Sequence, residues 1–201
     1  MASISLELPE NASEIVGPTD WSNWVIKGRV IAGAYPGHQN ETEHREVIQQ
    51  IIHKGNVTTF VCLQTEKELG RFRSYKEVAL TFKEDLQFVH FPIADQNIAN
   101  FDAVYHLVED LKSRLHNGEV LYIHCWGGHG RTGTIIGCLL ARLFDLSGDK
   151  ALELTQKFHS CRKICKSTSP QHPSQFKQVR DMAARYQKEK EESSSNQNSV
   201  V

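Results

Sequence analysis

Cys125 and Arg131 are the two residues of this sequence whose types and spacing best support chemistry. Five residues separate them, and the stretch around them reads HCWGGHGRTGT. An apolar run at 120–123 precedes this stretch and a second one at 135–140 follows it, which predicts a buried strand, a glycine-rich loop and a helix. The N–H groups of such a loop lie at the positive end of a helix, where an anion the size of phosphate can bind.

The thiol of Cys125 is expected at the floor of this anion site. A helix N-terminus and a neighbouring guanidinium both stabilise a thiolate, which is the nucleophilic form of cysteine. The planar fork of Arg131 also matches two phosphate oxygens, and the hydroxyl of Thr132 can donate toward the sulfur. The sequence therefore predicts a nucleophilic cysteine in a phosphate-binding loop. The loop residues are Trp126, Gly127, Gly128, His129, Gly130 and Arg131.

This loop resembles the signature of the cysteine-dependent protein tyrosine phosphatases, in which His-Cys and Arg-Ser/Thr flank five residues. The resemblance implies that Cys125 attacks phosphorus to form a phosphocysteine intermediate while Arg131 holds the phosphate. It also implies supporting roles for His124, which orients the loop, and for Thr132, which eases breakdown of the intermediate. Such chemistry uses neither a metal nor a cofactor. Every fixed position of the signature is filled, by His124, Cys125, Gly128, Arg131 and Thr132.

Asp95 is the candidate proton donor for the leaving oxygen. It follows a predicted strand in the segment FVHFPIADQ at 88–96, thirty residues before Cys125. This segment resembles the mobile acid loop of the same family. His124 is less suited to the task, because adjacent residues at a strand end point to opposite faces. A turn or helix-capping role is the alternative for Asp95, as for most loop aspartates.

Gln175 is a weaker candidate. The segment SPQHPSQF at 169–176 resembles one found after the signature helix in bacterial-type and atypical dual-specificity phosphatases. There a glutamine opens the last helix and can approach the hydrolytic water. A solvent-facing glutamine at a helix start fits the sequence equally well.

Alternating strand and helix patterns predict a single α/β domain of the tyrosine phosphatase type, with a central, mostly parallel sheet flanked by helices. Asp95 and Cys125 each follow a strand, so both are expected at the carboxyl edge of the sheet. We expect a loosely ordered segment at 1–20, the phosphatase domain at 21–188 and a disordered polar tail at 189–201. Two helices are predicted before the second half of the chain, one from Asn40 to about 55 and one within 64–85 that ends near 82. Another is predicted from Asn100 to about 117, and one runs from the glycine-rich loop to about 144. The last two are predicted from Asp149 to about 161 and at 174–190. Strands are predicted at 29–37, 57–63, 87–91 and 120–124.

Composition and charge argue against several classes of binding partner. The net charge is −1, and no run of eighteen apolar residues occurs, so neither nucleic acid nor a membrane span is expected. Five cysteines without a secretory signal favour free thiols and a cytoplasmic location. The ten histidines show no spacing typical of a metal site. The oligomeric state is not predicted.

The expected function is hydrolysis of phosphotyrosine in proteins by a tyrosine or dual-specificity phosphatase, with phosphoserine and phosphothreonine as further candidates. Phosphate, sulfate and vanadate-like anions are expected to bind the same loop. Two alternatives remain open: a phosphoinositide or inositol phosphate phosphatase, and a phosphate-binding module without turnover. The loop carries no lysine, and a protonated His129 would add one charge. A disulfide between Cys62 and Cys125 is a hypothesis for redox control, with packing as the other role of Cys62.

Overall fold

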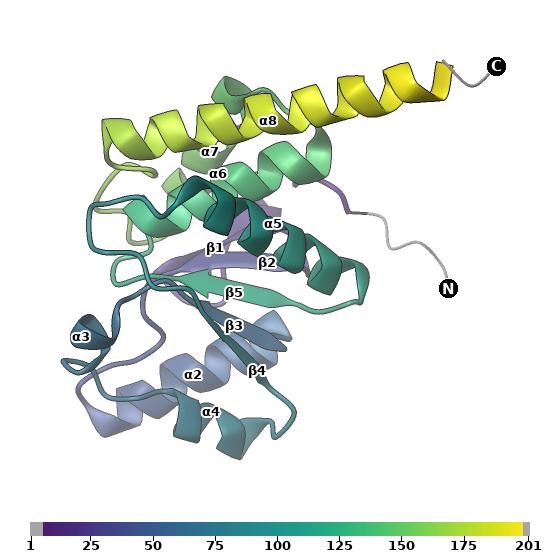
Figure 1. Ribbon diagram of the computed structural model, residues 1–201. Coiled ribbons are helices and arrows are strands. Elements are labelled where there is room, and N and C mark those ends of the chain that lie inside the picture. The colour runs from purple at the N-terminus through teal and green to yellow at the C-terminus, as the bar shows by residue number, and fades with distance from the viewer. Residues whose placement is uncertain (1–5, 199–201) are drawn as a thin grey trace.

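A five-stranded sheet lies at the centre of the molecule, between two layers of helices (Figure 1). The computed structural model describes residues 6–198. The strand order is β1-β2-β5-β3-β4, in which only the edge strand β1 runs antiparallel to its neighbour. The predicted α/β class and mostly parallel sheet are therefore confirmed. The strands are β1 (Ser22–Ile26), β2 (Val30–Gly33), β3 (Thr59–Cys62), β4 (Gln87–His90) and β5 (Leu121–His124).

The central strands bury both faces, as the apolar runs predict. In β5, Leu121 and Ile123 enter one hydrophobic core and Tyr122 enters the other, because successive strand residues point to opposite faces. Strand β1 was not predicted. Its polar Ser22 and Asn23 are buried, so the segment lacks the apolar run that marks the other strands.

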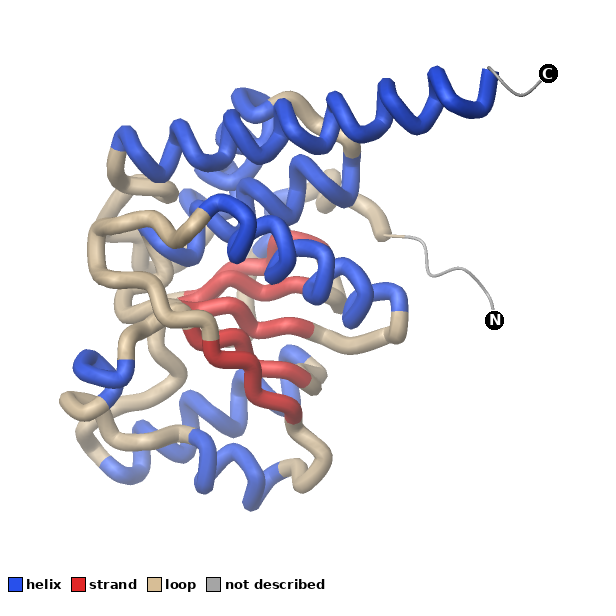
Figure 2. The backbone as a smooth tube through the Cα atoms, in the orientation of Figure 1, coloured by secondary structure: helices blue, strands red, loops and turns tan. Residues whose placement is uncertain are grey.

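Two groups of helices cover the sheet. Figure 2 shows α5 to α8 on one face and α2 with α4 on the other. Helix α6, which begins in the glycine-rich loop, contacts α7 and α8 most extensively and also packs on β2 and β5. The helices are α1 (Ala12–Ile15), α2 (Glu41–Gly55), α3 (Glu66–Leu69), α4 (Lys76–Phe82), α5 (Phe101–His116), α6 (Gly130–Phe144), α7 (Gly148–Ser160) and α8 (Pro173–Asn198).

The predicted starts of α2 and α5 are confirmed. Asn40 accepts a hydrogen bond from the backbone N–H of Glu43 at 3.1 Å, and Asn100 accepts one from Ala103 at 3.1 Å. Each side chain thereby satisfies one of the N–H groups that a helix N-terminus leaves unpaired.

Both ends of the chain have more structure than the sequence led us to expect. Near the N-terminus, Ile15 is buried and Val16 bridges to β1, whereas 1–20 was expected to be loosely ordered. At the other end α8 continues to Asn198, through most of the expected disordered tail. Its charged residues are good helix formers, and Lys190 pairs with Asp145 beyond the end of α6. Residues 1–5 and 199–201 lie outside the described part.

Candidate active site

The glycine-rich loop connects β5 to α6 at the carboxyl edge of the sheet, as predicted. Gly128 adopts a φ of +71°, and a Cβ atom there would lie 2.3 Å from the carbonyl oxygen of Gly33 at the end of β2. Only glycine fits this approach. Within residues 6–198, the backbone N–H groups of 126–129 donate to no protein acceptor. Unpaired donors at the N-terminus of a buried helix are the kind of groups that bind an anion, so this loop is a candidate anion-binding site.

The thiol of Cys125 lies at the start of this loop and is 3% exposed. The hydroxyl of Thr132, in the first turn of α6, donates to Cys125 Sγ at 3.2 Å. The structure thus brings together the predicted nucleophile and the predicted supporting hydroxyl, because one turn of helix returns residue 132 to the loop start.

Arg131 is 2% exposed, and most of the N–H groups of its guanidinium face protein oxygen atoms. Its Nη1 donates to the backbone oxygen of Ile93 at 2.9 Å and to Glu68 Oε2 at 2.8 Å. Its Nη2 lies 2.8 Å from Glu68 Oε1 and 2.9 Å from Asp95 Oδ1. Its Nε is buried and has no partner among the described residues. Because buried donors are nearly always paired, this Nε is the donor most available to a bound anion.

Glu68 is a site residue that sequence reasoning missed. It lies in the single-turn helix α3, where Thr65 donates to Glu68 Oε2 through its backbone N–H at 3.0 Å and through its hydroxyl at 2.9 Å. Burial alone would raise the pKa of the Glu68 carboxyl, but hydrogen bonds from Arg131 and Thr65 outweigh it and lower that pKa. Glu68 is therefore an anion that fixes the plane of the Arg131 guanidinium by a bidentate contact.

Asp95 lies on the loop that follows β4 and is brought to Arg131 as the sheet topology predicts. Ile93 anchors the loop, since it is buried and its N–H donates to Leu63 beyond β3 at 3.1 Å. The Asp95 side chain is 54% exposed. Its carboxylate can thus reach both Arg131 and the solvent side of the site.

His124 is fully buried behind the loop and takes no part in the anion site. Its Nδ1 faces the carbonyl oxygen of Cys125 at 3.3 Å, and its Nε2 lies 2.9 Å from the hydroxyl of Tyr75. Since Nδ1 faces a carbonyl, the proton is assigned there, and the Tyr75 hydroxyl donates to Nε2. Burial lowers the pKa of His124 to about 3, so the ring is neutral at physiological pH.

His129 does not supply the positive charge that the sequence allowed. Its Nδ1 lies 3.0 Å from His159 Nε2, which also faces the carbonyl oxygen of Ser167 at 3.0 Å. His159 therefore donates and His129 accepts. Burial, together with the cation of Arg162, lowers the pKa of His129 to about 4. The ring is neutral at physiological pH, and only the backbone of His129 remains available to an anion.

Arg162 is a second buried arginine at this loop that the sequence did not reveal. It is 5% exposed, and its Nε donates to Asn23 in β1 at 2.7 Å. Its Nη1 approaches the carbonyl oxygen of Gly127 at 3.4 Å. Burial lowers its pKa to about 10, and within residues 6–198 no carboxylate pairs with it. Arg162 thus adds a positive charge behind the loop and holds one of its carbonyls.

Gln175 links the glycine-rich loop to the loop of Asp95. Its Oε1 accepts from the backbone N–H groups of Gln171 and His172 at 3.1 Å each, and its Nε2 donates to the carbonyl oxygen of Asn97 at 3.2 Å. A Cβ atom at Gly130 would lie 2.9 Å from Gln175 Oε1. Gln175 is buried, so the solvent-facing alternative is wrong.

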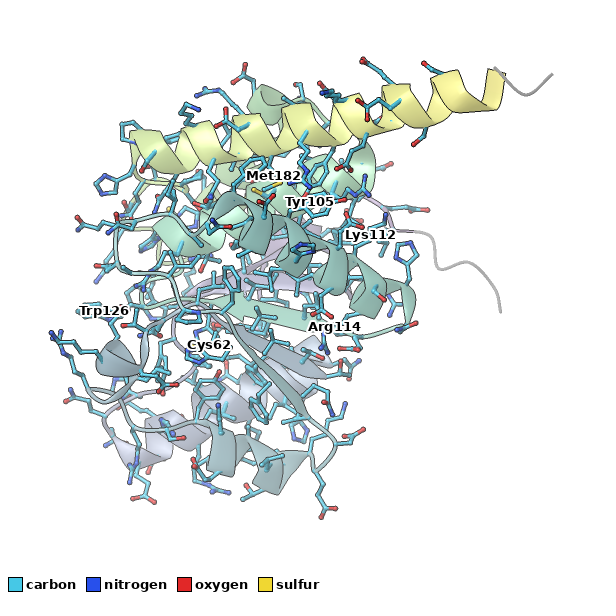
Figure 3. All side chains as sticks on the ribbon, in the orientation of Figure 1. Cys62, Tyr105, Lys112, Arg114, Trp126 and Met182 are labelled. Carbon is cyan, nitrogen blue, oxygen red and sulfur yellow. The ribbon has the colours of Figure 1, made fainter. Side chains whose placement is uncertain are left out.

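Trp126 is 54% exposed and lies beside α3, at the carboxyl end of the strands (Figure 3). Cys62, also labelled in Figure 3, lies at the end of β3 and is a buried free thiol. Burial raises the pKa of Cys62 to about 11, which favours packing over reaction. In the described part of the chain no three His, Cys, Asp or Glu side chains are grouped to hold a metal ion. No helix between residues 6 and 198 is long and apolar enough to cross a membrane.

Comparison with curated proteins finds relatives that include a putative tyrosine phosphatase. The chain is 31% identical over 145 residues to "Putative tyrosine phosphatase 067L" of Invertebrate iridescent virus 3, covering 70% of this chain and 54% of that protein. It is 31% identical over 90 residues to human "Cyclin-dependent kinase inhibitor 3", covering 44% of this chain and 42% of that protein. The chain therefore spans about half the length of these two relatives.

Solved structures share the fold. Tk-PTP in its active form aligns with a TM-score of 0.62 at 20% identity, covering 78% of this chain and 92% of that one. PTPMT1 in complex with PI(5)P aligns with a TM-score of 0.67 at 16% identity, covering 84% of this chain and 98% of that one. The model of the family "Swiss Army Knife protein, DSP-PTPase phosphatase domain" matches residues 19–192. With its Cys125 thiol, its Arg131 fork and this match over most of its length, the chain belongs to the PTP-SAK family of dual-specificity-type phosphatases.

Proposed function

We propose that this phosphatase hydrolyses phosphotyrosine, and also phosphoserine and phosphothreonine, in proteins through a phosphocysteine intermediate. The observation that carries the proposal is the arrangement around Arg131. Its unpartnered Nε and the unpaired loop N–H groups of 126–129 are the donors that a phosphoryl group needs. The thiol of Cys125 begins the same loop. Positioned donors of this kind supply most of the rate acceleration in phosphoryl transfer.

In the first step, the Cys125 thiolate attacks phosphorus and the bond from phosphorus to the ester oxygen breaks. Arg131 and the loop N–H groups hold the three equatorial oxygens. Asp95 transfers its proton to the departing oxygen, so the leaving group departs as a neutral alcohol or phenol. The exposure of Asp95 supports this role, because a leaving group that points out of the loop lies toward solvent.

In the second step, water attacks phosphorus and the sulfur–phosphorus bond breaks. The carboxylate of Asp95 accepts a proton from this water, and Cys125 departs as a thiolate. The hydrogen bond from Thr132 to Sγ, 3.2 Å long, stabilises that thiolate. The amide of Gln175 keeps the Asp95 loop against α8 through Asn97.

Charge supports a phosphoprotein over a phosphoinositide as substrate. A polyphosphorylated head group needs several cations near the loop, and this loop offers Trp126 and a neutral His129 where further cations would be required. Relatives that act on phosphoinositides exist, such as "Phosphatidylinositol 3,4,5-trisphosphate 3-phosphatase cnrN" of Dictyostelium discoideum, 24% identical over 162 residues. A test of substrate class must therefore include a phosphoinositide.

Hydrolysis of para-nitrophenyl phosphate in the presence of a metal chelator is the first test. Four variants decide it: Cys125→Ser and Asp95→Ala in the site, with Cys165→Ser and Asp85→Ala as matched controls at exposed positions outside it. We expect wild-type turnover that Cys125→Ser abolishes and Asp95→Ala lowers by about 10²-fold or more. The two controls should match the wild type.

No turnover by reduced wild type, with vanadate still bound, would replace this proposal with a phosphate-binding module. Activity retained by Cys125→Ser would refute the phosphocysteine intermediate. In parallel, faster turnover of PI(5)P than of phosphotyrosine peptides would move the substrate class to phosphoinositides.

A further inference from the structure

A cavity adjoins the phosphate loop on the side of Trp126 and α3. Its volume is about 380 Å³, and its walls come from the segment after β2, from α3 with the turn that follows it, and from the loop itself. Glu68 both lines this cavity and binds Arg131, so the cavity adjoins the candidate active site. A side chain next to a phosphorylated residue is therefore the part of a substrate that could occupy it.

Aromatic rings form one wall of the cavity. Tyr35 and Phe72 lie with ring centroids 4.5 Å apart, and Phe72 meets the edge of Trp126 at 5.7 Å. Two backbone-directed hydrogen bonds fix this wall: the Tyr35 hydroxyl donates to the carbonyl oxygen of Arg73 at 2.7 Å, and the Tyr35 N–H donates to that of Trp126 at 2.8 Å. The wall is therefore a rigid surface for apolar side-chain atoms.

Arg71 brings a positive charge without a partner among the described residues to the wall of the cavity. It is exposed and lines the cavity, and its side chain has no partner among residues 6–198. The other basic lining residues already lie against carboxylates. Arg73 lies 3.2 Å from Glu41, and His38 lies 3.3 Å from Glu43. One unpaired guanidinium thus faces a cavity with aromatic walls.

We propose that this cavity binds the side chain of an acidic residue that flanks the phosphorylated residue of a protein substrate, with the carboxylate on Arg71. The proposal rests on the proposed function and specifies the substrate class. A carboxylate on a short apolar stem matches one guanidinium and the wall of Tyr35, Phe72 and Trp126. A second phosphate of an inositol ring fits less well, since a single unpaired cation would meet a dianion and its hydration shell.

The test compares two phosphotyrosine peptides that differ only in the flanking residues, glutamate in one and alanine in the other. The enzymes are the wild type, Arg71→Ala, Arg71→Glu and Lys67→Ala. Lys67 is the matched control, because it is an exposed cation on α3 that does not line the cavity. The readout is the ratio of kcat/KM for the two peptides, with para-nitrophenyl phosphate as the reference for basal turnover of the wild type.

We expect the wild type to favour the glutamate peptide about fivefold, the size typical of one exposed ion pair. Arg71→Ala should lose this preference, Arg71→Glu should reverse it, and Lys67→Ala should keep it. Equal rates on both peptides, with normal turnover of the reference ester, would overturn the cavity assignment and leave the proposed function intact. An unchanged ratio in Arg71→Ala, or a wild-type preference for PI(5)P over both peptides, would also overturn it. No turnover of any ester would refute the proposed function itself.

Discussion

Removal of the Glu68 carboxylate should cost this phosphatase a large part of its activity, although Glu68 touches no reacting atom. The structure shows two charge-assisted hydrogen bonds from Arg131 to Glu68, both 2.8 Å long, and they fix the guanidinium plane. In Glu68→Ala the buried cation keeps only the carbonyl of Ile93 and the exposed carboxylate of Asp95. It could then rotate out of the plane that the contact with Glu68 now fixes.

The size of the effect follows from these contacts. A hydrogen bond to a charged group contributes about 1.5 to 3 kcal/mol. The two bonds share one guanidinium, and water can enter because the Glu68 side chain is 13% exposed, so their sum is an overestimate. We expect a loss of about 2 to 3 kcal/mol of transition-state stabilisation, roughly 30- to 150-fold in kcat/KM. Glu68→Gln should lie between Glu68→Ala and wild type, since its amide oxygen accepts one bond while its NH₂ opposes the guanidinium.

The assay is kcat/KM for para-nitrophenyl phosphate, together with the dissociation constant of vanadate and a thermal unfolding curve. Glu66→Ala is the control: Glu66 belongs to the same short helix, but its side chain is 82% exposed and, among residues 6–198, pairs only with His90. Activity within about twofold of wild type is expected there, as for other exposed ion pairs. A folded Glu68→Ala protein with wild-type kcat/KM and vanadate affinity would refute the view that Glu68 positions Arg131.

Three further predictions concern the loop and its support. Gly128→Ala, which forces a Cβ against Gly33 at positive φ, should lower the free energy of unfolding by about 2 kcal/mol or more. Gly70→Ala should not, because a Cβ there would make only ordinary van der Waals contacts, at 3.8 Å; equal urea midpoints for the two variants would contradict this. Arg162→Gln should weaken vanadate binding by about threefold to tenfold, because a buried cation leaves the loop; unchanged titration curves would contradict it. Burial lowers the pKa of His159 to about 3 in the folded protein, against about 6.5 in the unfolded chain. Between about pH 6.5 and pH 3 the unfolded chain therefore binds more protons than the folded protein, and the free energy of unfolding falls as pH falls. His159→Gln should therefore reduce the loss of stability between pH 7 and pH 5 in urea titrations, and an identical slope would count against it.

The parts of the site that lie close together in the chain could be predicted from the sequence. The proposed nucleophile Cys125, the proposed phosphate-binding Arg131 and the proposed supporting hydroxyl of Thr132 fall within one strand, loop and helix, so local spacing fixes their geometry. Asp95 could be identified in a second way, because the residues that follow parallel strands lie at a common edge of the sheet. Here the sheet topology contributed as much as the motif.

Glu68 and Arg162 could not be identified in this way, since long-range packing selects them from several equivalent residues. The Thr65-to-Glu68 spacing is a capping-box pattern, and it signals a helix start, but it does not reveal that the capping carboxylate also binds an arginine 63 residues later. Arg162 begins a basic segment that includes Lys163 and Lys166, and only contact with β1 buries it. A buried charge and its exposed neighbours look alike in sequence.

The hydrogen-bond inventory of Arg131 links phosphate binding to the position of the acid. A guanidinium has five N–H donors. The two N–H groups of Nη1 face Glu68 and the carbonyl oxygen of Ile93, and the two of Nη2 face Glu68 and Asp95. The N–H group of Nε has no partner among the described residues. A phosphate that takes the fork through Nε and Nη2 must therefore displace Asp95 from Nη2, while Glu68 and Ile93 keep the plane fixed. We infer that Asp95 and phosphate compete for one N–H, and that this displacement releases the carboxyl group to approach the leaving oxygen as the substrate binds.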